Sequence, residues 1–264
     1  MKYLLYVLAI VMCFWVNPIL GAIVLTLALL YLVFMGYPKI LAIKGNAAFS
    51  SGDTEKALRL YKKAAMSANS NAKTRTTYAV LLLRSGAPES AEKEFTRVVS
   101  SGLFKAEEKN YAKQYRAMAY YKLGNLKDAI DDAKEVYSTT HSTQIYSVLG
   151  FLMTVSGEAK EDILAFCEEA YEYNSDERDI IDNLVVALTL NGELIRAKEL
   201  AQKLTEEQPG FVEGFYHLAV ICKMQGDIDG LKKAAEGLKD TNRSYMTTVT
   251  EEEVNSIITE AENA

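Results

Sequence analysis

The side chains that most often carry out chemistry are few in this sequence and far apart. Its two histidines are His141 and His217, and its three cysteines are Cys13, Cys167 and Cys222. None has the neighbouring His, Cys, Asp or Glu residues at ligand spacing that a zinc site needs, and no nucleophile has an evident base. Glycine-rich phosphate loops and nucleophile elbows are absent from the sequence as well. We therefore expect no metal, no cofactor and no enzymatic activity.

Charge is abundant, but its distribution does not suggest a nucleic-acid partner. Acidic runs such as Glu168-Glu169, Asp176-Glu177-Arg178-Asp179 and Glu251-Glu252-Glu253 suit solvated helix faces and first helical turns. Beyond residue 37 there are 28 basic and 35 acidic residues, a net charge of −7. Such a chain has no evident stripe of basic residues for phosphates. Cys167 and Cys222 fall on apolar helical faces, which predicts packed, reduced thiols.

A glycine recurs at a nearly constant interval, and this interval reveals the elements that position every other side chain. The intervals are 34, 38, 33, 35 and 34 residues, measured between Gly52, Gly86, Gly124, Gly157, Gly192 and Gly226. Each glycine is followed by residues at steps of four and three, as in Ala57, Tyr61 and Ala64, and these steps keep side chains on one helical face. A small residue, or in one copy a valine, stands seven positions before each glycine and lets two helices approach closely. Each unit is thus a pair of helices that must stack on its neighbours to bury its apolar face.

This pattern of small and aromatic residues resembles the tetratricopeptide repeat family over about residues 38–240. The resemblance implies an all-α fold, a right-handed superhelical α-solenoid of about six helix-turn-helix repeats. The sequence departs from the family pattern in lacking its tryptophan in every copy. The fourth copy also needs one inserted residue to align Ile163, Cys167 and Ala170, and Pro209 alone supplies the closing proline.

The periodic pattern stops after Asp240, and residues 241–264 form a separate C-terminal part. Thr241–Val249 is expected to be a loop. Thr250 and Glu253 then form a capping-box pattern before apolar residues at helical spacing. The predicted helix would cap the apolar end of the last repeat, as solenoids require for solubility. The alternative is an element that binds a partner or inhibits the protein itself.

The N-terminal segment carries no charge between residues 3 and 35. One helix of that length would reach about 50 Å, whereas a hydrocarbon core is about 30 Å thick. Asn17-Pro18 should interrupt it, which predicts a hydrophobic helical hairpin of Tyr3–Val16 and Ile19–Met35. Gly36-Tyr37-Pro38 is expected to end the second helix. The predicted domains are therefore a transmembrane anchor over 1–37, the solenoid over 38–240 and the loop with its capping helix over 241–264.

The few flanking charges suggest the orientation of the hairpin. Lys2 precedes it and Lys39 and Lys44 follow it, so both ends and the repeats should face the cytoplasm at the cytoplasmic membrane. The alternative is a single tilted span, mostly Ile19–Met35, which would place the repeats on the opposite side. A cleaved signal peptide is not favoured, because the apolar run continues past Gly21-Ala22.

The resemblance also implies a concave groove lined by the first helix of each repeat. The residues that it assigns to a peptide-binding groove are Asn46, Phe49, Thr77, Arg84, Tyr111, Tyr115, Met118, Tyr121, Lys122, Phe151, Asn183, Tyr216 and His217. Tyrosines in its middle supply apolar area and a hydroxyl at low entropic cost, which suits an extended or helical peptide. The alternative is that several of these tyrosines pack between repeats.

One specialised function of the family is not expected here. Asn46 matches one position of the clamp that holds C-terminal carboxylates in co-chaperone repeats. Ala42, Thr77, Tyr111 and Tyr115 stand where that clamp has basic residues and a second asparagine, so nothing remains to pair a carboxylate. The expected function is a membrane-anchored adaptor or scaffold that binds a protein or peptide segment. The alternative is a structural or assembly subunit of a larger membrane complex, with the hairpin making the key contacts.

Overall fold

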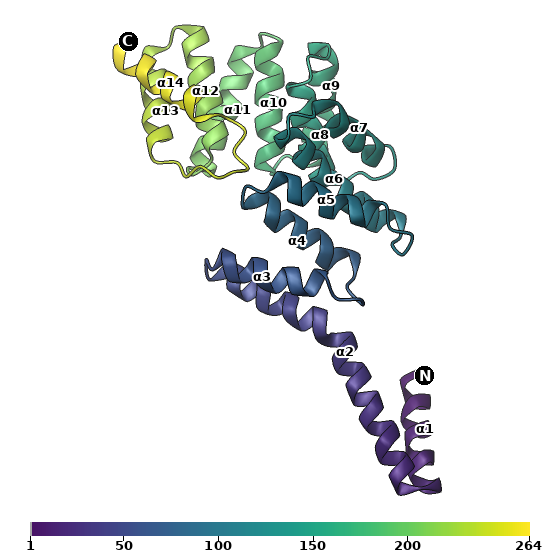
Figure 1. Cartoon of the computed structure of the whole chain (residues 1–264). Coiled ribbons are helices and arrows are strands. Elements are labelled where there is room, and N and C mark those ends of the chain that lie inside the picture. Colours follow the sequence, from purple (N-terminus) through teal and green to yellow (C-terminus); the bar gives the residue numbers. More distant parts are fainter. Residues whose placement is uncertain (1) are drawn as a thin grey trace. The chain divides into compact units, whose positions relative to one another are not determined.

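The structure, a computed structural model, describes residues 2–264 and is helical, with no strand in that range (Figure 1). This confirms the predicted all-α class. The chain divides into two compact units, one ending at Tyr78 and the other spanning Ala79–Ala264. The helices are α1 (Lys2–Val16), α2 (Pro18–Ser50), α3 (Thr54–Ala65), α4 (Ala72–Arg84), α5 (Pro88–Val99), α6 (Ala106–Lys122), α7 (Leu126–Tyr137), α8 (Thr143–Thr154), α9 (Lys160–Tyr173), α10 (Arg178–Leu190), α11 (Leu194–Glu207), α12 (Val212–Gln225), α13 (Ile228–Lys239) and α14 (Glu251–Asn263).

In the first unit, α1 and α2 pack together as the predicted hairpin (Figure 1). Asn17 caps α2, because its side-chain oxygen accepts hydrogen bonds from the backbone N–H groups of Ile19 (2.8 Å) and Leu20 (3.3 Å). Pro18 occupies the first helical position, where no N–H is needed. The ring of Phe14 lies directly against Gly21, where any larger residue would clash. The turn and the close contact therefore both follow from local residue choice.

The predicted helix end at Pro38 is wrong, since α2 continues through Pro38 to Ser50. A proline inside a helix removes the N–H that would bond the carbonyl four residues earlier, here that of Phe34. The structure satisfies this carbonyl from another element: Asn69 Nδ2, in the turn between α3 and α4, donates to Phe34 O at 2.7 Å. The first helix of the first repeat is therefore the direct continuation of the apolar helix.

This arrangement predicts a coupling between Asn69 and Pro38. Asn69→Ala should lower the free energy of unfolding by about 1 kcal/mol, because it leaves the Phe34 carbonyl without its donor. In a Pro38→Ala background the restored N–H of residue 38 can bond that carbonyl, so the same substitution should cost little. Thermal unfolding of the four full-length chains in detergent checks this. Equal costs in both backgrounds would contradict the pairing.

The C-terminal half of α2 packs against α3 through small residues. Gly45 and Ala48 are buried, and a Cβ on Gly45 would lie 2.6 Å from Cδ2 of Tyr61. The Tyr61 hydroxyl donates to Asn46 Oδ1 at 2.5 Å. The predicted role of the small residue seven positions before the repeat glycine is confirmed for this pair.

In the second unit, helices from α5 to α13 pack on their neighbours in chain order. The helices α6, α8, α10 and α12 also contact one another in succession, so the first helices of the repeats form one continuous wall. All six repeat glycines have positive φ, between 67° and 83°, as the predicted turns require. The stacked pairs are therefore an α-solenoid, as the sequence predicted.

The irregular fourth copy folds like its neighbours. Ile163, Cys167 and Ala170 are all buried on α9, which confirms the one-residue insertion that aligns them. Cys222 is buried on α12. Burial raises the pKa of the Cys167 thiol to about 12, so this side chain is neutral and packed rather than reactive.

The predicted loop and capping helix also form. Thr250 Oγ1 accepts a hydrogen bond from the Glu253 N–H at 3.2 Å, while Glu253 Oε2 accepts one from the Thr250 N–H at 2.7 Å. Val254, Ile257 and Ala261 are buried as α14 packs on α12 and α13, so α14 covers the last repeat (Figure 1).

Candidate binding groove

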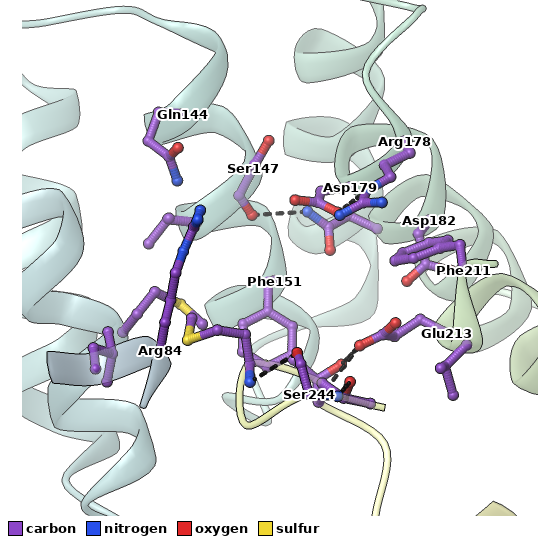
Figure 2. A pocket seen from close by; sticks show the side chains of 18 of the residues that line it. Arg84, Gln144, Ser147, Phe151, Arg178, Asp179, Asp182, Phe211, Glu213 and Ser244 are labelled. Carbon is purple, nitrogen blue, oxygen red and sulfur yellow. Dashed lines mark hydrogen bonds and ion pairs between the residues drawn. The ribbon is translucent and has the colours of Figure 1, made fainter. Parts of the chain in front are cut away.

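The inner wall of the second unit and the loop before α14 enclose a cavity of about 320 Å³, which we call the groove. Residues from the end of α4 and from α6, α8, α10 and the start of α12 line it (Figure 2). The lining comprises Val80, Leu83, Arg84, Tyr115, Met118, Gln144, Ser147, Val148, Phe151, Arg178, Asp179, Asp182, Asn183, Gly210, Phe211, Val212, Glu213, Asn242, Ser244, Met246, Thr247 and Thr248.

The structure brings together five of the residues that the sequence assigned to a groove: Arg84, Tyr115, Met118, Phe151 and Asn183. Figure 2 shows Arg84 on one side of the cavity and Arg178, Asp179 and Phe211 on the other, with Phe151 between them. Asn46, Phe49 and Thr77 belong to the first unit. Tyr216 lines a second hollow, between α12 and α14.

The tyrosines of α6 are partly engaged in packing. Tyr111 meets Tyr115 edge to face with ring centroids 5.3 Å apart, and Tyr115 stacks on buried Phe95 at 6.4 Å. Partial burial raises the pKa of Tyr115 to about 12, with further contributions from its contact with Tyr111. Tyr121 meets Phe151 edge to face at 4.8 Å. These rings are therefore held in place while Tyr115 and Phe151 still line the groove.

Asn183 is not available as a free hydrogen-bonding group. Its side chain is buried, and its Nδ2 donates to the Ser147 carbonyl at 2.9 Å. Gly150 makes room for it, because a Cβ at that position would lie 2.9 Å from the Asn183 amide nitrogen. The amide thus ties α10 to α8 and contributes shape to the groove wall.

The opposite side of the groove carries three acidic side chains beside Arg178, a grouping that the sequence pattern did not indicate. Asp179 was interpreted as part of a solvated run, yet it lines the groove together with Asp182 and Glu213. Asp179 and Asp182 are three residues apart, so helical spacing alone could have placed them on one face with the inner wall. Withdrawal from bulk water in this concave site raises the pKa of Asp179 to about 6, although its side chain remains half exposed.

His217, a predicted groove residue, pairs with Asp182 behind this acidic side. Its Nδ1 lies 2.7 Å from Asp182 Oδ1, and Asp182 is buried. Burial lowers the pKa of His217, but the charge and hydrogen bond of Asp182 outweigh it, so the pKa is raised overall. The ion pair links α12 to α10.

The His217 pair predicts a pH-dependent stability. A histidine with a raised pKa contributes stability that is complete below its unfolded value of about 6.5 and is lost as the pH rises through the folded value. His217→Ala should therefore destabilise the protein by about 2 kcal/mol at pH 5.5, because buried Asp182 loses its charged partner. The cost should be clearly smaller at pH 9, where the histidine is neutral. Denaturant unfolding at the two pH values measures this, and a cost that does not change with pH would contradict it.

The loop between α13 and α14 forms the last wall of the groove. Glu213 accepts hydrogen bonds from the backbone N–H (2.8 Å) and hydroxyl (3.2 Å) of Thr248, and Lys122 Nζ donates to the Thr247 carbonyl at 2.8 Å. The Tyr245 ring packs against Gly86, in the turn before α5. The loop thus reaches from the last repeat to the turn before α5. No periodicity in the sequence indicated this position.

The wider set of chemistry-bearing residues gives no further centre. Among residues 2–264, no group of three or more His, Cys, Asp or Glu side chains is placed to hold a metal ion.

Comparison with known proteins supports the repeat fold. Residues 48–102 match the family model described as tetratricopeptide repeat. No curated protein sequence gives a significant match to this chain.

Solved structures with the same fold share little sequence with this chain. A tetratricopeptide repeat protein from Parabacteroides merdae is 14% identical, with a TM-score of 0.59 over 86% of this chain and 99% of the other. The pilF protein of Pseudomonas aeruginosa is 15% identical, with a TM-score of 0.60 over 77% and 90%. YrrB, described as a TPR protein with an unusual peptide-binding site, is 18% identical, with a TM-score of 0.50 over 77% and 98%.

Proposed function

Because the chain is a tetratricopeptide repeat protein by its matched repeats and by its fold, we propose that it is a membrane-anchored adaptor. Its second unit would bind a segment of a partner protein in the groove. The observation that carries this proposal is the groove itself, where Tyr115, Met118 and Phe151 face Asp179 and Asp182 across a cavity. The groove is concave and combines apolar and aromatic side chains with charged ones, and groups of both kinds set affinity and orientation in binding sites.

The lining suggests the chemistry of the segment. Tyr115, Met118 and Phe151 offer an apolar surface for one side chain of the segment. Asp179 is half exposed and pairs with Arg178 at 3.4 Å, so a lysine or arginine of the segment would have to share or replace that partner. YrrB, which resembles this chain in fold, is described as having an unusual peptide-binding site, and this supports peptide binding as the kind of function. The segment would lie against the loop between α13 and α14, because Ser244, Thr247 and Thr248 of that loop line the groove.

The N-terminal hairpin would hold the adaptor at the bilayer. The helix α2 has a mean hydropathy of 2.5 over an 18-residue window, and only 6% of that window is buried. Trp15 is 93% exposed at the hairpin turn. An exposed apolar helix of span length is costly in water, and a lipid bilayer would remove that cost. Lys39 and Lys44 after the hairpin favour cytoplasmic repeats.

Photo-crosslinking in native membranes tests the adaptor proposal. A photoreactive phenylalanine analogue at Tyr115 of the full chain should capture one defined partner. The matched control is the same analogue at Ile195, which is 75% exposed on α11 and does not line the groove. Adding Phe151→Ala should strongly reduce capture from position 115. Equal capture from both positions, or capture unaffected by Phe151→Ala, would contradict a groove-bound partner.

A second candidate is an assembly subunit that uses the hairpin for its essential contacts. The exposed apolar side chains of α1 and α2 favour it, because they could pack against other membrane helices as well as against lipid. Replacing residues 1–37 by an unrelated anchor distinguishes the two functions. An adaptor keeps its groove partner after the exchange, whereas an assembly subunit loses its complex.

A further inference from the structure

Charge is divided unevenly between the two units. Residues 37–78 contain eight basic and two acidic residues, whereas residues 79–264 contain 20 basic and 33 acidic residues. The basic excess therefore belongs to the first repeat and the start of α4, which directly follow the apolar hairpin. An overall net charge of −6 conceals this basic region.

The lysines of the first repeat and of the start of α4 are exposed and have no ion-pair partner in the part of the chain that the structure describes. They are Lys39, Lys44, Lys56, Lys62, Lys63 and Lys73. Many basic residues of the second unit are paired instead, with carboxylates on a neighbouring helix or in the turn beside one. Examples are Lys113–Glu135, Arg116–Asp132, Lys134–Glu158, Lys198–Asp227 and Lys223–Glu260. A group of unpaired lysines repels itself unless an external anion neutralises it.

The fold brings these lysines to the end of the apolar helix. The bond from Asn69 to the Phe34 carbonyl fixes the turn after α3 against α2, where the uncharged stretch ends. Lys62 and Lys63 lie in the last turn of α3, just before this turn, and Lys39 lies five residues after Phe34 on α2. Irregular turns that face lipid do not occur within the hydrocarbon core of a bilayer. The turn that contains Asn69, and the Phe34 carbonyl bonded to it, should therefore lie at or outside the boundary of that core.

The same part of α2 mixes apolar and basic side chains on one exposed face. Tyr37, Ile40 and Lys44 are all exposed and follow at steps of three and four residues, so they share a face. Leu41 and Gly45, on another face, are buried against α3. Aromatic, aliphatic and lysine side chains on one face are typical of helices at a membrane–water interface.

We propose that the first repeat is a lipid-binding module whose lysines bind the headgroups of anionic phospholipids. Lys39, Lys44, Lys62 and Lys63 of this repeat, together with Lys73 at the start of α4, would lie in the headgroup layer next to the part of α2 that lies in the hydrocarbon. The inference rests on the proposed membrane anchor. Lipid is favoured over nucleic acid because the basic residues adjoin an exposed apolar helix of span length. This module would anchor the first repeat to the membrane surface and leave partner binding to the second unit.

Lysine footprinting of the full chain in nanodiscs tests the proposal. Acetylation rates are measured by mass spectrometry in two kinds of disc. One contains neutral phosphatidylcholine alone, and in the other about a third of the lipid is anionic phosphatidylglycerol, which attracts basic segments. Each lysine near an anionic lipid surface strengthens the binding of the protein to that surface roughly fivefold. We expect each of the five lysines to be acetylated at least about fivefold more slowly in anionic discs than in neutral discs, which is roughly the effect of one lysine on binding. High salt should abolish this difference between the two kinds of disc.

Matched controls lie on the second unit. Lys127, Lys232 and Lys233 are exposed and without ion-pair partners among the described residues, and their rates should change less than about twofold, since the proposal assigns lipid binding to lysines of the first unit alone. Trp15, the only tryptophan of the chain, reports anchoring separately through the blue shift of its emission in either disc.

The outcomes separate the two proposals. Slow acetylation in anionic discs that is confined to the five named lysines supports the lipid module. A blue-shifted Trp15 with equal lysine rates in both discs overturns the module and keeps the anchor. Emission of Trp15 as in water overturns both. Protection of the same lysines by added RNA in neutral discs, without protection by anionic lipid, would also overturn the lipid assignment.

Discussion

Glu213→Gln is expected to release the loop before α14 from the groove. The Glu213 carboxylate accepts two hydrogen bonds from Thr248, one from its backbone N–H and one from its hydroxyl. A hydrogen bond to a charged acceptor is worth about 1.5–3 kcal/mol and one to a neutral acceptor about 0.5–1.5 kcal/mol. Glutamine keeps an acceptor oxygen, so the exchange rate of the Thr248 N–H should rise by roughly tenfold. Hydrogen exchange with fragment analysis measures this.

The matched control for Glu213 is Glu253→Gln. It weakens the capping box at Thr250 and should leave Thr248 protected. If Thr248 exchanges equally in both variants and in the unchanged chain, Glu213 does not hold the loop. If release of the loop also strengthens partner capture from position 115, the loop competes with the partner for the groove.

Phe95→Ala should have the largest effect on stability. Phe95 is fully buried between α5 and α6 and stacks on Tyr115, which lines the groove. Removing a buried phenylalanine costs about 3–5 kcal/mol. For a unit of this size, each kcal/mol corresponds to about 2–4 °C, so the melting temperature should fall by roughly 6–20 °C. The capture of a partner at Tyr115 should weaken as well, because the ring loses its support.

The control for Phe95 is Leu103→Ala, at a position 87% exposed in the loop between α5 and α6. That change should shift the melting temperature by less than about 2 °C, as surface substitutions usually do. A small effect of Phe95→Ala, similar to that of Leu103→Ala, would show that the contact between α5 and Tyr115 does not support the wall.

Features that depend on neighbouring residues could be predicted from the sequence. The glycine period, the turn at Asn17-Pro18 and the capping box at Thr250 each follow from local rules of backbone geometry, and all three are present in the structure. The assignment of Arg84, Tyr115, Met118 and Phe151 to one inner wall needed only the repeat register.

Features that depend on distant residues could not be predicted. Pro38 is tolerated because Asn69, 31 residues away in the chain, supplies a donor to the carbonyl that the proline leaves unpaired. The position of Thr248 depends on Glu213, 35 residues away. In both cases a single polar group from another element decides the outcome, and no periodic pattern encodes that partnership.

The groove of the second unit is proposed to bind a segment of a partner protein. Its most direct measurement is a titration of the captured segment against the full chain and against Tyr115→Ala, with Ile195→Ala as the surface control. A buried tyrosine at the centre of an interface is worth at least about 2 kcal/mol, so Tyr115→Ala should weaken binding by roughly 30-fold or more. Ile195→Ala should leave the affinity unchanged. Equal affinity of the Tyr115→Ala variant and the unchanged chain would show that the segment does not bind in the groove.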